Sequence, residues 1–146
     1  MISILLSFIY LVSGNSNGYF RRPYRLTLSS SSYTAGNSYN LTLESTGNAK
    51  FKGYIIAGFA GSTTPTYFSQ SNILGEIIPI TNGMGVMTNC SGAITQTDGN
   101  IDKSTVSGKW IAPKTIGKGI VIFWAKVITN GINHDIYSHP ITEKIN

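Results

Sequence analysis

Apolar and polar residues alternate with a period of two along several short segments of the chain. In residues 39–44 the apolar positions are Tyr39, Leu41 and Leu43, and residues 25–29 alternate in the same way. Successive side chains of a strand point to opposite faces of a sheet, so this pattern predicts strands with one buried face and one face in water. We therefore expect Tyr39, Leu41 and Leu43 to point into a core.

Other segments are apolar almost throughout. Residues 53–59 (GYIIAGF) and 119–129 (GIVIFWAKVIT) predict central strands, and Trp124 is expected in the core. A further strand ends at Pro113, which cannot donate to a hydrogen-bond ladder. Its buried face is predicted to consist of Val106, Gly108, Trp110 and Ala112. Residues 137–142 predict a last strand, with Pro140 at an edge or a bulge.

Turn-forming pairs separate these segments at intervals of 8 to 15 residues, for example Asn82-Gly83 and Asn130-Gly131. This spacing is typical of a β-sandwich or a barrel. The composition agrees, because the chain has 20 isoleucines against 8 leucines, and Ser, Thr, Asn and Gly supply 60 of its 146 residues. Such a chain is expected to be all-β and to form one domain, which excludes a helical bundle, a coiled coil and a disordered tail.

The amino-terminal segment is apolar from Ile2 to Val12 and continues into Ser13-Gly14. A run of this length is too short for a membrane span of about 20 residues, and the small residues after it suit cleavage. We interpret residues 1–14 as a secretory signal peptide and residues 15–146 as the mature domain. A buried first strand or a truncated stub remains the alternative, since no Lys or Arg precedes the run. The expected location is secreted and extracellular.

Three side chains bear on that compartment. Asn40 and Asn89 begin N-glycosylation sequons, although a chain rich in Asn and Thr also forms sequons by chance. Cys90 is the only cysteine, so no intrachain disulfide is possible. Its thiol is either free, buried, or available for an intermolecular bridge that would link two chains.

The order of the motifs resembles the reeler (reelin-type) domain family over residues 23–141. The residues that carry the resemblance are YTAGNSYNLTL at 33–43, FKGYIIAG at 51–58, Cys90 with AITQTD at 93–98, K-x-x-V with WIAP at 103–113, and GIVIFWAKVI at 119–128. The resemblance implies an immunoglobulin-like antiparallel β-sandwich of about seven to nine strands. It departs at two points: the family's amino-terminal cysteine partner is missing, and Gln96 replaces a histidine.

Catalytic chemistry is poorly provided for. The two histidines, His134 and His139, are expected at the surface or in loops, and in a strand His134 and Asp135 would point to opposite faces. Glu76 is expected to point outward from an edge strand. The acids Glu44, Asp98, Asp102 and Glu143 are placed in turns or on wet faces, and the D-x-N-x-D run at 98–102 is interpreted as a polar turn. We expect no catalytic residue, no metal site and no cofactor.

Binding is better provided for, because the chain carries a net charge of +5 and its basic residues stand beside aromatic ones. The candidate ligand-binding residues are Arg21, Arg22, Arg25, Lys50 and Lys52, together with Tyr67 and Phe68 in a loop. A third basic group, Lys109, Lys114 and Lys118, surrounds the Trp110–Pro113 corner. The alternative is that these lysines only keep the surface soluble.

The predicted function is that of a secreted, non-enzymatic binding module. The resemblance implies recognition of microbial or cell-surface components, lipopolysaccharide or anionic glycans, in innate defence. Two alternatives stay open: a matrix or adhesion module that self-associates, with Cys90 bridging two chains, and the reeler fragment of a ferric reductase-like membrane protein. Nucleic acid and stable membrane insertion are not expected.

Overall fold

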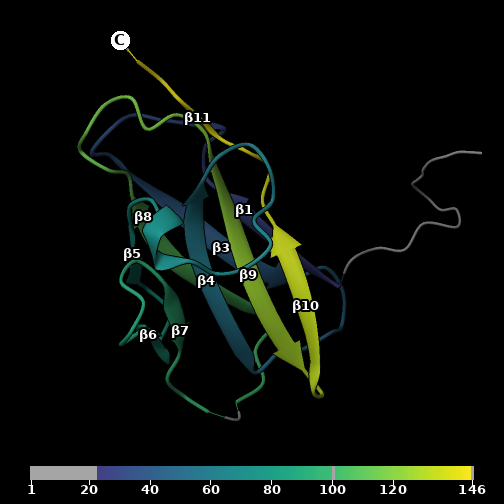
Figure 1. Ribbon diagram of the computed structural model, residues 1–146. Coiled ribbons are helices and arrows are strands. Elements are labelled where there is room, and N and C mark those ends of the chain that lie inside the picture. Colours follow the sequence, from purple (N-terminus) through teal and green to yellow (C-terminus); the bar gives the residue numbers. More distant parts are fainter. Residues whose placement is uncertain (1–22, 100, 146) are drawn as a thin grey trace, which may run out of the picture.

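The computed structural model describes residues 23–99 and 101–145, and within them strands dominate (Figure 1). The strands are β1 (Tyr24–Leu28), β2 (Ser32–Tyr33), β3 (Ser38–Ser45), β4 (Gly53–Ala60), β5 (Glu76–Pro79), β6 (Met84–Val86), β7 (Ile94–Gln96), β8 (Thr105–Ile111), β9 (Val121–Thr129), β10 (Ile132–Tyr137) and β11 (Thr142–Glu143). A single 3₁₀ turn, η1 (Gln70–Asn72), lies between β4 and β5 in this part of the chain. The predicted signal peptide, residues 1–14, falls outside the described residues.

Two antiparallel sheets pack face to face. One has the strand order β1-β3-β8-β5 and the other has the order β10-β9-β4-β7-β6. A short parallel pair, β11 with β2, adds a third small sheet at one end. The prediction of an all-β sandwich is confirmed, and the nine strands of the two large sheets match the expected seven to nine.

The period-two pattern sets which side chains enter the core. Leu41 and Leu43 of β3 are 1% and 0% exposed, as predicted, and they face Gly108 and Val106 of β8. Trp110 lies at the centre of an aromatic cluster with Tyr33, Tyr39 and Phe123, at ring-centroid distances of 5.2, 6.1 and 5.1 Å. Its indole N–H donates to the Leu74 carbonyl at 3.0 Å, so the one polar atom of this large side chain is satisfied.

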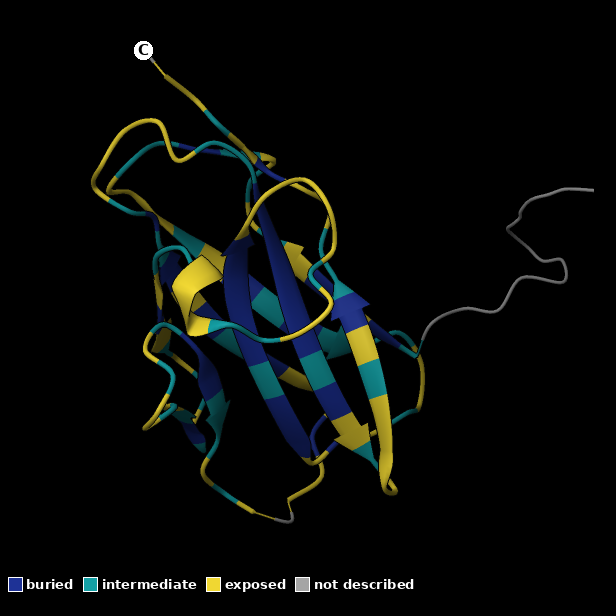
Figure 2. Cartoon of the chain, in the orientation of Figure 1, coloured by how far each residue is buried: buried dark blue, intermediate teal, exposed yellow. Residues whose placement is uncertain are grey.

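A second hydrophobic cluster covers the outer face of the five-stranded sheet. Trp124 is 2% exposed, as expected, but it belongs to this outer cluster with Ala57, Phe59 and Ala93. The segment between β4 and β5 crosses in front of the sheet and supplies the cover (Figures 1 and 2). Phe68 packs on Trp124 with a ring-centroid distance of 4.4 Å. Where this segment covers it, the five-stranded sheet is therefore apolar on both faces, which explains why its central strands are almost continuously hydrophobic.

One sequence prediction is wrong. Residues 137–142 do not form one strand: β10 ends at Tyr137, the chain breaks at Ser138–Pro140, and β11 pairs in parallel with β2. Pro140 and the crossover to a different sheet account for the break. Asp98 lies beside a turn, as expected, but its side chain is only 15% exposed and lies 2.8 Å from Lys103 Nζ.

Glu76 and the two histidines can also be compared with their expected positions. Glu76 is exposed on β5, an edge strand. His139 is exposed after β10, whereas His134 lies within β10, half-buried, with its ring 5.4 Å from that of Tyr24. The register places His134 opposite Val127 on the core side and Asp135 opposite Lys126 on the outer side, as predicted for neighbours in a strand.

Candidate anion-binding surface

Carboxylates neutralise several of the basic side chains. Arg25 donates from Nε and Nη2 to Glu44 Oε2 at 3.2 and 2.9 Å. Lys52 Nζ lies 3.8 Å from Asp102 Oδ1, and Lys126 Nζ lies 3.1 Å from Asp135 Oδ1. These cations are less available to an external anion than lysines that have no carboxylate nearby.

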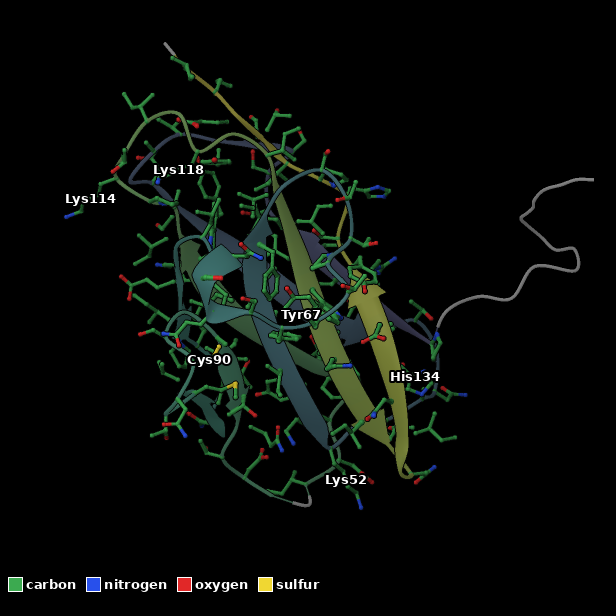
Figure 3. All side chains as sticks on the ribbon, viewed as in Figure 1. Lys52, Tyr67, Cys90, Lys114, Lys118 and His134 are labelled. Atoms are coloured by element: carbon green, nitrogen blue, oxygen red, sulfur yellow. The ribbon has the colours of Figure 1, made fainter. Side chains whose placement is uncertain are left out.

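The structure describes only some of the basic residues that were predicted to bind a ligand. Arg21 and Arg22 lie outside the described residues. Lys50 is exposed, and among the described residues no carboxylate lies within 4.0 Å of its ammonium group. The backbone of Lys50 lies beside the β9–β10 hairpin, because its carbonyl accepts hydrogen bonds from Tyr24 and Thr129. Lys52 is at the same end of the sandwich (Figure 3).

A different group of lysines gathers at the opposite end. Lys114 and Lys118 lie within the loop between β8 and β9, and Figure 3 shows them far from Lys52. Lys144 follows β11, whose Glu143 contacts the same loop. In the described part of the chain none of these three ammonium groups has a carboxylate within 4.0 Å. We call Lys114, Lys118 and Lys144 the lysine end.

The loop that carries the lysine end is fixed by the Glu143 carboxylate. Its two oxygens accept hydrogen bonds from the backbone N–H groups of Gly117, at 2.9 and 3.1 Å, and of Gly119, at 2.9 Å. Both glycines have positive φ, 94° and 76°, a conformation that side-chain-bearing residues rarely adopt. The Pro113 carbonyl accepts from Gly36 N at 3.0 Å and ties the start of the loop to the turn before β3.

The same hydrogen bonds tune the titration of the groups involved. Backbone N–H donation from Gly119 and Gly117 lowers the pKa of Glu143 below its ordinary value of 4.5. Tyr33, whose hydroxyl donates to the Gly119 carbonyl at 2.6 Å, has its pKa raised to about 12, chiefly by burial and then by the charge of Glu143. At neutral pH the Glu143 charge is therefore directed at backbone amides, while the three ammonium groups stay exposed.

The predicted aromatic loop is divided by the fold. Tyr67 is 67% exposed, whereas Phe68 is half-buried against Phe59 and Trp124. The Tyr137 hydroxyl donates to the Pro65 carbonyl at 3.3 Å and helps to hold the loop on the sheet. Tyr67 thus remains available for contact, and Phe68 has a packing role.

The modification candidates lie on accessible or partly accessible surface. Asn40 is exposed on the outer face of the four-stranded sheet opposite Lys109, and Asn89 is exposed in the turn before β7. Cys90 is a free thiol, half-buried against the outer cluster.

A groove runs along the open edge of the sandwich between β1 and β10. Its main part has a volume of about 430 Å³, and a smaller part of about 180 Å³ continues toward β2. Arg25 and His139 contribute to the lining, but the Arg25 guanidinium is already bonded to Glu44. No group of three or more His, Cys, Asp or Glu side chains in the described chain is placed to hold a metal ion.

Comparison with known proteins defines the family. The Reeler domain family model matches residues 13–141, which is most of the chain. The chain belongs to the Reeler domain family. The human F-spondin reeler domain superposes with a TM-score of 0.70 at 20% identity, covering 84% of this chain and 90% of that one. The Reelin-N domain of F-spondin superposes with a TM-score of 0.71 at 20% identity, covering 89% and 92%. No curated protein sequence matches.

Membership sets the broad character of this reeler domain. Reeler domains are non-catalytic modules and are typically extracellular. Within the described residues no helix is long and apolar enough to cross a membrane. At 20% identity the F-spondin structures establish the fold, and the lysine end is defined by residues of this chain.

Sequence reasoning found two of the three lysines but did not choose them. Lys114 and Lys118 were placed around the Trp110–Pro113 corner, whereas Lys144 was missed because only the β11–β2 pairing brings the carboxyl-terminal strand to this loop. The signal in the sequence is Gly-Lys-Gly at 117–119, since the two glycines on either side of Lys118, both in left-handed conformation, point their N–H groups toward one carboxylate.

Proposed function

We propose that this reeler domain is a secreted binding module of innate defence whose lysine end holds polyanionic components of microbial or cell surfaces, lipopolysaccharide phosphates or anionic glycans. The observation that carries the proposal is the gathering of Lys114, Lys118 and Lys144 on one end, without a carboxylate within 4.0 Å in the described chain. A binding role also agrees with the non-catalytic nature of the family.

The proposal assigns a joint effect to these charges because the segments that carry them are hydrogen-bonded to each other. At physiological salt, exposed charges interact over a screening length of about 8 Å, so scattered lysines act separately. Lys114 and Lys118 lie on one pinned loop, and Lys144 follows the strand that pins it. A phosphate or sulfate at this end would meet several ammonium groups together. The acidic residue within the group, Glu143, is engaged by Gly117 and Gly119 N–H groups.

Heparin and lipopolysaccharide binding in physiological salt test the proposal. The protein is expressed in cultured cells from the full coding sequence and purified from the culture medium. The variant K114Q/K118Q/K144Q is compared with K50Q/K52Q/K109Q, which removes the same charge from three other exposed lysines. We expect the first variant to lose at least tenfold in affinity, since each lysine near an anionic surface contributes about 1 kcal/mol.

Both variants must first show the thermal stability and secretion level of the unmodified protein. Equal loss in the two variants would contradict a localised site and would indicate attraction by net charge alone. No binding of the unmodified protein to either polyanion would refute the proposed function. A selective loss in K50Q/K52Q/K109Q would move the site to the residues predicted from sequence.

A further inference from the structure

Two strongly exposed isoleucines accompany the lysines. Ile116 is 66% exposed and lies between Lys114 and Lys118 in the β8–β9 loop. Ile145 is 65% exposed and directly follows Lys144. Single exposed apolar residues are common, but here each isoleucine stands next to basic residues of the lysine end.

The segments that carry the two isoleucines are hydrogen-bonded to each other. Ile116 precedes Gly117, whose N–H lies 2.9 Å from a carboxylate oxygen of Glu143, and Ile145 follows Glu143 by two residues. The Lys144 N–H donates to the Tyr33 carbonyl at 2.7 Å, which extends the strand pairing almost to Ile145. The two apolar side chains are thus presented by segments that are hydrogen-bonded to each other and to the sandwich.

We propose that the lysine end docks on an anionic lipid surface, with Ile116 and Ile145 entering the boundary between headgroups and acyl chains. Lysine ammonium groups pair with lipid phosphates, and their long aliphatic stems reach up from the apolar depth to the headgroups. This inference rests on the proposed function and specifies its ligand as a lipid assembly. The contact is peripheral and reversible, because two isoleucines bury much less apolar surface than the helix of about 20 apolar residues that spans a membrane.

The isoleucines are what favours a lipid surface over a soluble glycan. A sulfated or phosphorylated glycan would satisfy the three ammonium groups, but it would offer no apolar medium to Ile116 and Ile145. A lipid surface satisfies both features at once, since anionic headgroups attract the lysines and acyl chains accept the isoleucines. Glu143 has no lipid contact in this arrangement and acts as a positioning residue, because it fixes the loop through Gly117 and Gly119.

The opposite end provides a matched control. Ile128 and Ile132 are 44% and 59% exposed at the β9–β10 hairpin, where Lys50 and Lys52 also lie. There, however, Lys52 lies 3.8 Å from Asp102, which is itself 60% exposed at its side chain. The same number of isoleucines can therefore be changed at a surface that has apolar exposure but only one lysine, Lys50, without a carboxylate within 4.0 Å in the described chain.

The test measures co-sedimentation with vesicles of phosphatidylcholine alone and of phosphatidylcholine with 30 mol% phosphatidylglycerol, and heparin affinity in parallel. The variants are I116S/I145S, I128S/I132S and K114Q/K118Q/K144Q in the protein released by cultured cells. We expect the unmodified protein to bind only the anionic vesicles. I116S/I145S should lose about tenfold or more in vesicle binding and keep its heparin affinity, in line with the transfer free energy of two isoleucine side chains.

The outcomes separate this inference from the proposed function. Unchanged vesicle binding by I116S/I145S, or an equal loss in I128S/I132S, would overturn the lipid inference. Heparin binding without vesicle binding would also overturn it and leave the proposed anion site standing. If K114Q/K118Q/K144Q kept both activities, the proposed function and the lipid inference would fail together.

Discussion

Removal of the buried ammonium group of Lys103 is expected to destabilise the domain strongly. Lys103 and Asp98 side chains are only 8% and 15% exposed, and Nζ lies 2.8 Å from Oδ1 as an ion pair without the alignment of a hydrogen bond. Nζ also donates to the carbonyls of Ile101, at 2.7 Å, and Lys52, at 3.0 Å. Lys103→Met preserves the shape of the side chain but leaves a nearly buried carboxylate and two carbonyls without their donor.

The size of the effect follows from which groups lose their partners. Breaking a buried pair from one side costs about 3 to 5 kcal/mol. Asp98→Asn should cost less, about 1 to 3 kcal/mol, because Lys103 keeps two carbonyl acceptors. The double variant should cost less than the sum, with a coupling of about 2 kcal/mol, since it leaves no unpaired charge. The exposed pair offers a control, and Lys52→Met should cost less than about 1 kcal/mol.

Urea unfolding followed by tryptophan fluorescence measures these differences. With an m-value of about 2 kcal/mol/M, Lys103→Met should lower the unfolding midpoint by about 2 M. Asp98→Asn should also lower the pKa of Tyr54 from its raised value of about 12, because the Asp98 charge is the second cause of that shift after burial. A Lys103→Met effect no larger than that of Lys52→Met, or strict additivity in the double variant, would refute the reasoning.

Three further predictions concern backbone space and titration. Gly75→Ala should lower the free energy of unfolding in urea by about 2 kcal/mol or more, because φ is +69° and a Cβ would lie 2.4 Å from the Ile111 carbonyl oxygen. Gly131→Ala, at φ +75° with nothing within 4 Å of a Cβ, should lower it only by the backbone strain of about 1 kcal/mol. Equal losses in the two variants would contradict the steric argument. Absorbance at 295 nm should show Tyr33 and Tyr54 ionising near pH 12. Because both pKa values are raised in the folded state, the stability that these tyrosines give is present below pH 10 and lost between about pH 10 and 12. Tyr54→Phe should remove one of the two late-titrating groups, and an unchanged late step in the absorbance would contradict the assignment. The lowered pKa of Glu143 gives the folded domain stability that is present above pH 4.5, its ordinary pKa, and is lost as the pH falls through the lowered folded pKa. The Tm difference between the unmodified protein and Glu143→Gln should therefore shrink on acidification. A Tm difference that stays constant from pH 7 to pH 3 would contradict this prediction.

The repetitive part of the fold was predictable because sheet geometry repeats. A strand reverses its side chains at every residue, so the alternation around Leu41 and Leu43 determined both the strand and its buried face. The same reasoning found the face that contains Trp110 and the outward position of Glu76. Strand pairing order could not be read in this way, because period-two patterns do not say which strand lies next to which.

The continuously apolar strands contained a signal that was only partly used. Residues 53–59 and 119–129 were predicted to be central, which is correct. A sheet that is apolar on both faces also needs a second cover, and the segment that carries Phe68 provides it. Phe68 was instead placed in a contact surface, because a loop rich in Thr and Ser gives no periodic sign of the face it will cover.

Charge pairing was the least predictable feature, because it depends on tertiary contacts. Asp98 and Lys103 stand in a polar stretch that predicts a turn, yet Lys103 forms a bridge with Phe51 and its nearly buried ammonium group lies 2.8 Å from Asp98. The carboxyl-terminal strand likewise joins β2 rather than continuing from β10, and only this pairing brings Glu143 to its loop.

Pairing with carboxylates distinguishes the basic side chains of this domain from one another. Of the nine Lys and Arg residues in the described chain, four have a carboxylate within 4.0 Å: Arg25, Lys52, Lys103 and Lys126. Three of the remaining five are the lysine end. A net charge of +5 predicts attraction to anions without predicting a place for it. The proposed function puts that place at the lysine end, where Gly117 and Gly119 N–H groups donate to the Glu143 carboxylate and where, in the described chain, Lys114, Lys118 and Lys144 have no carboxylate within 4.0 Å.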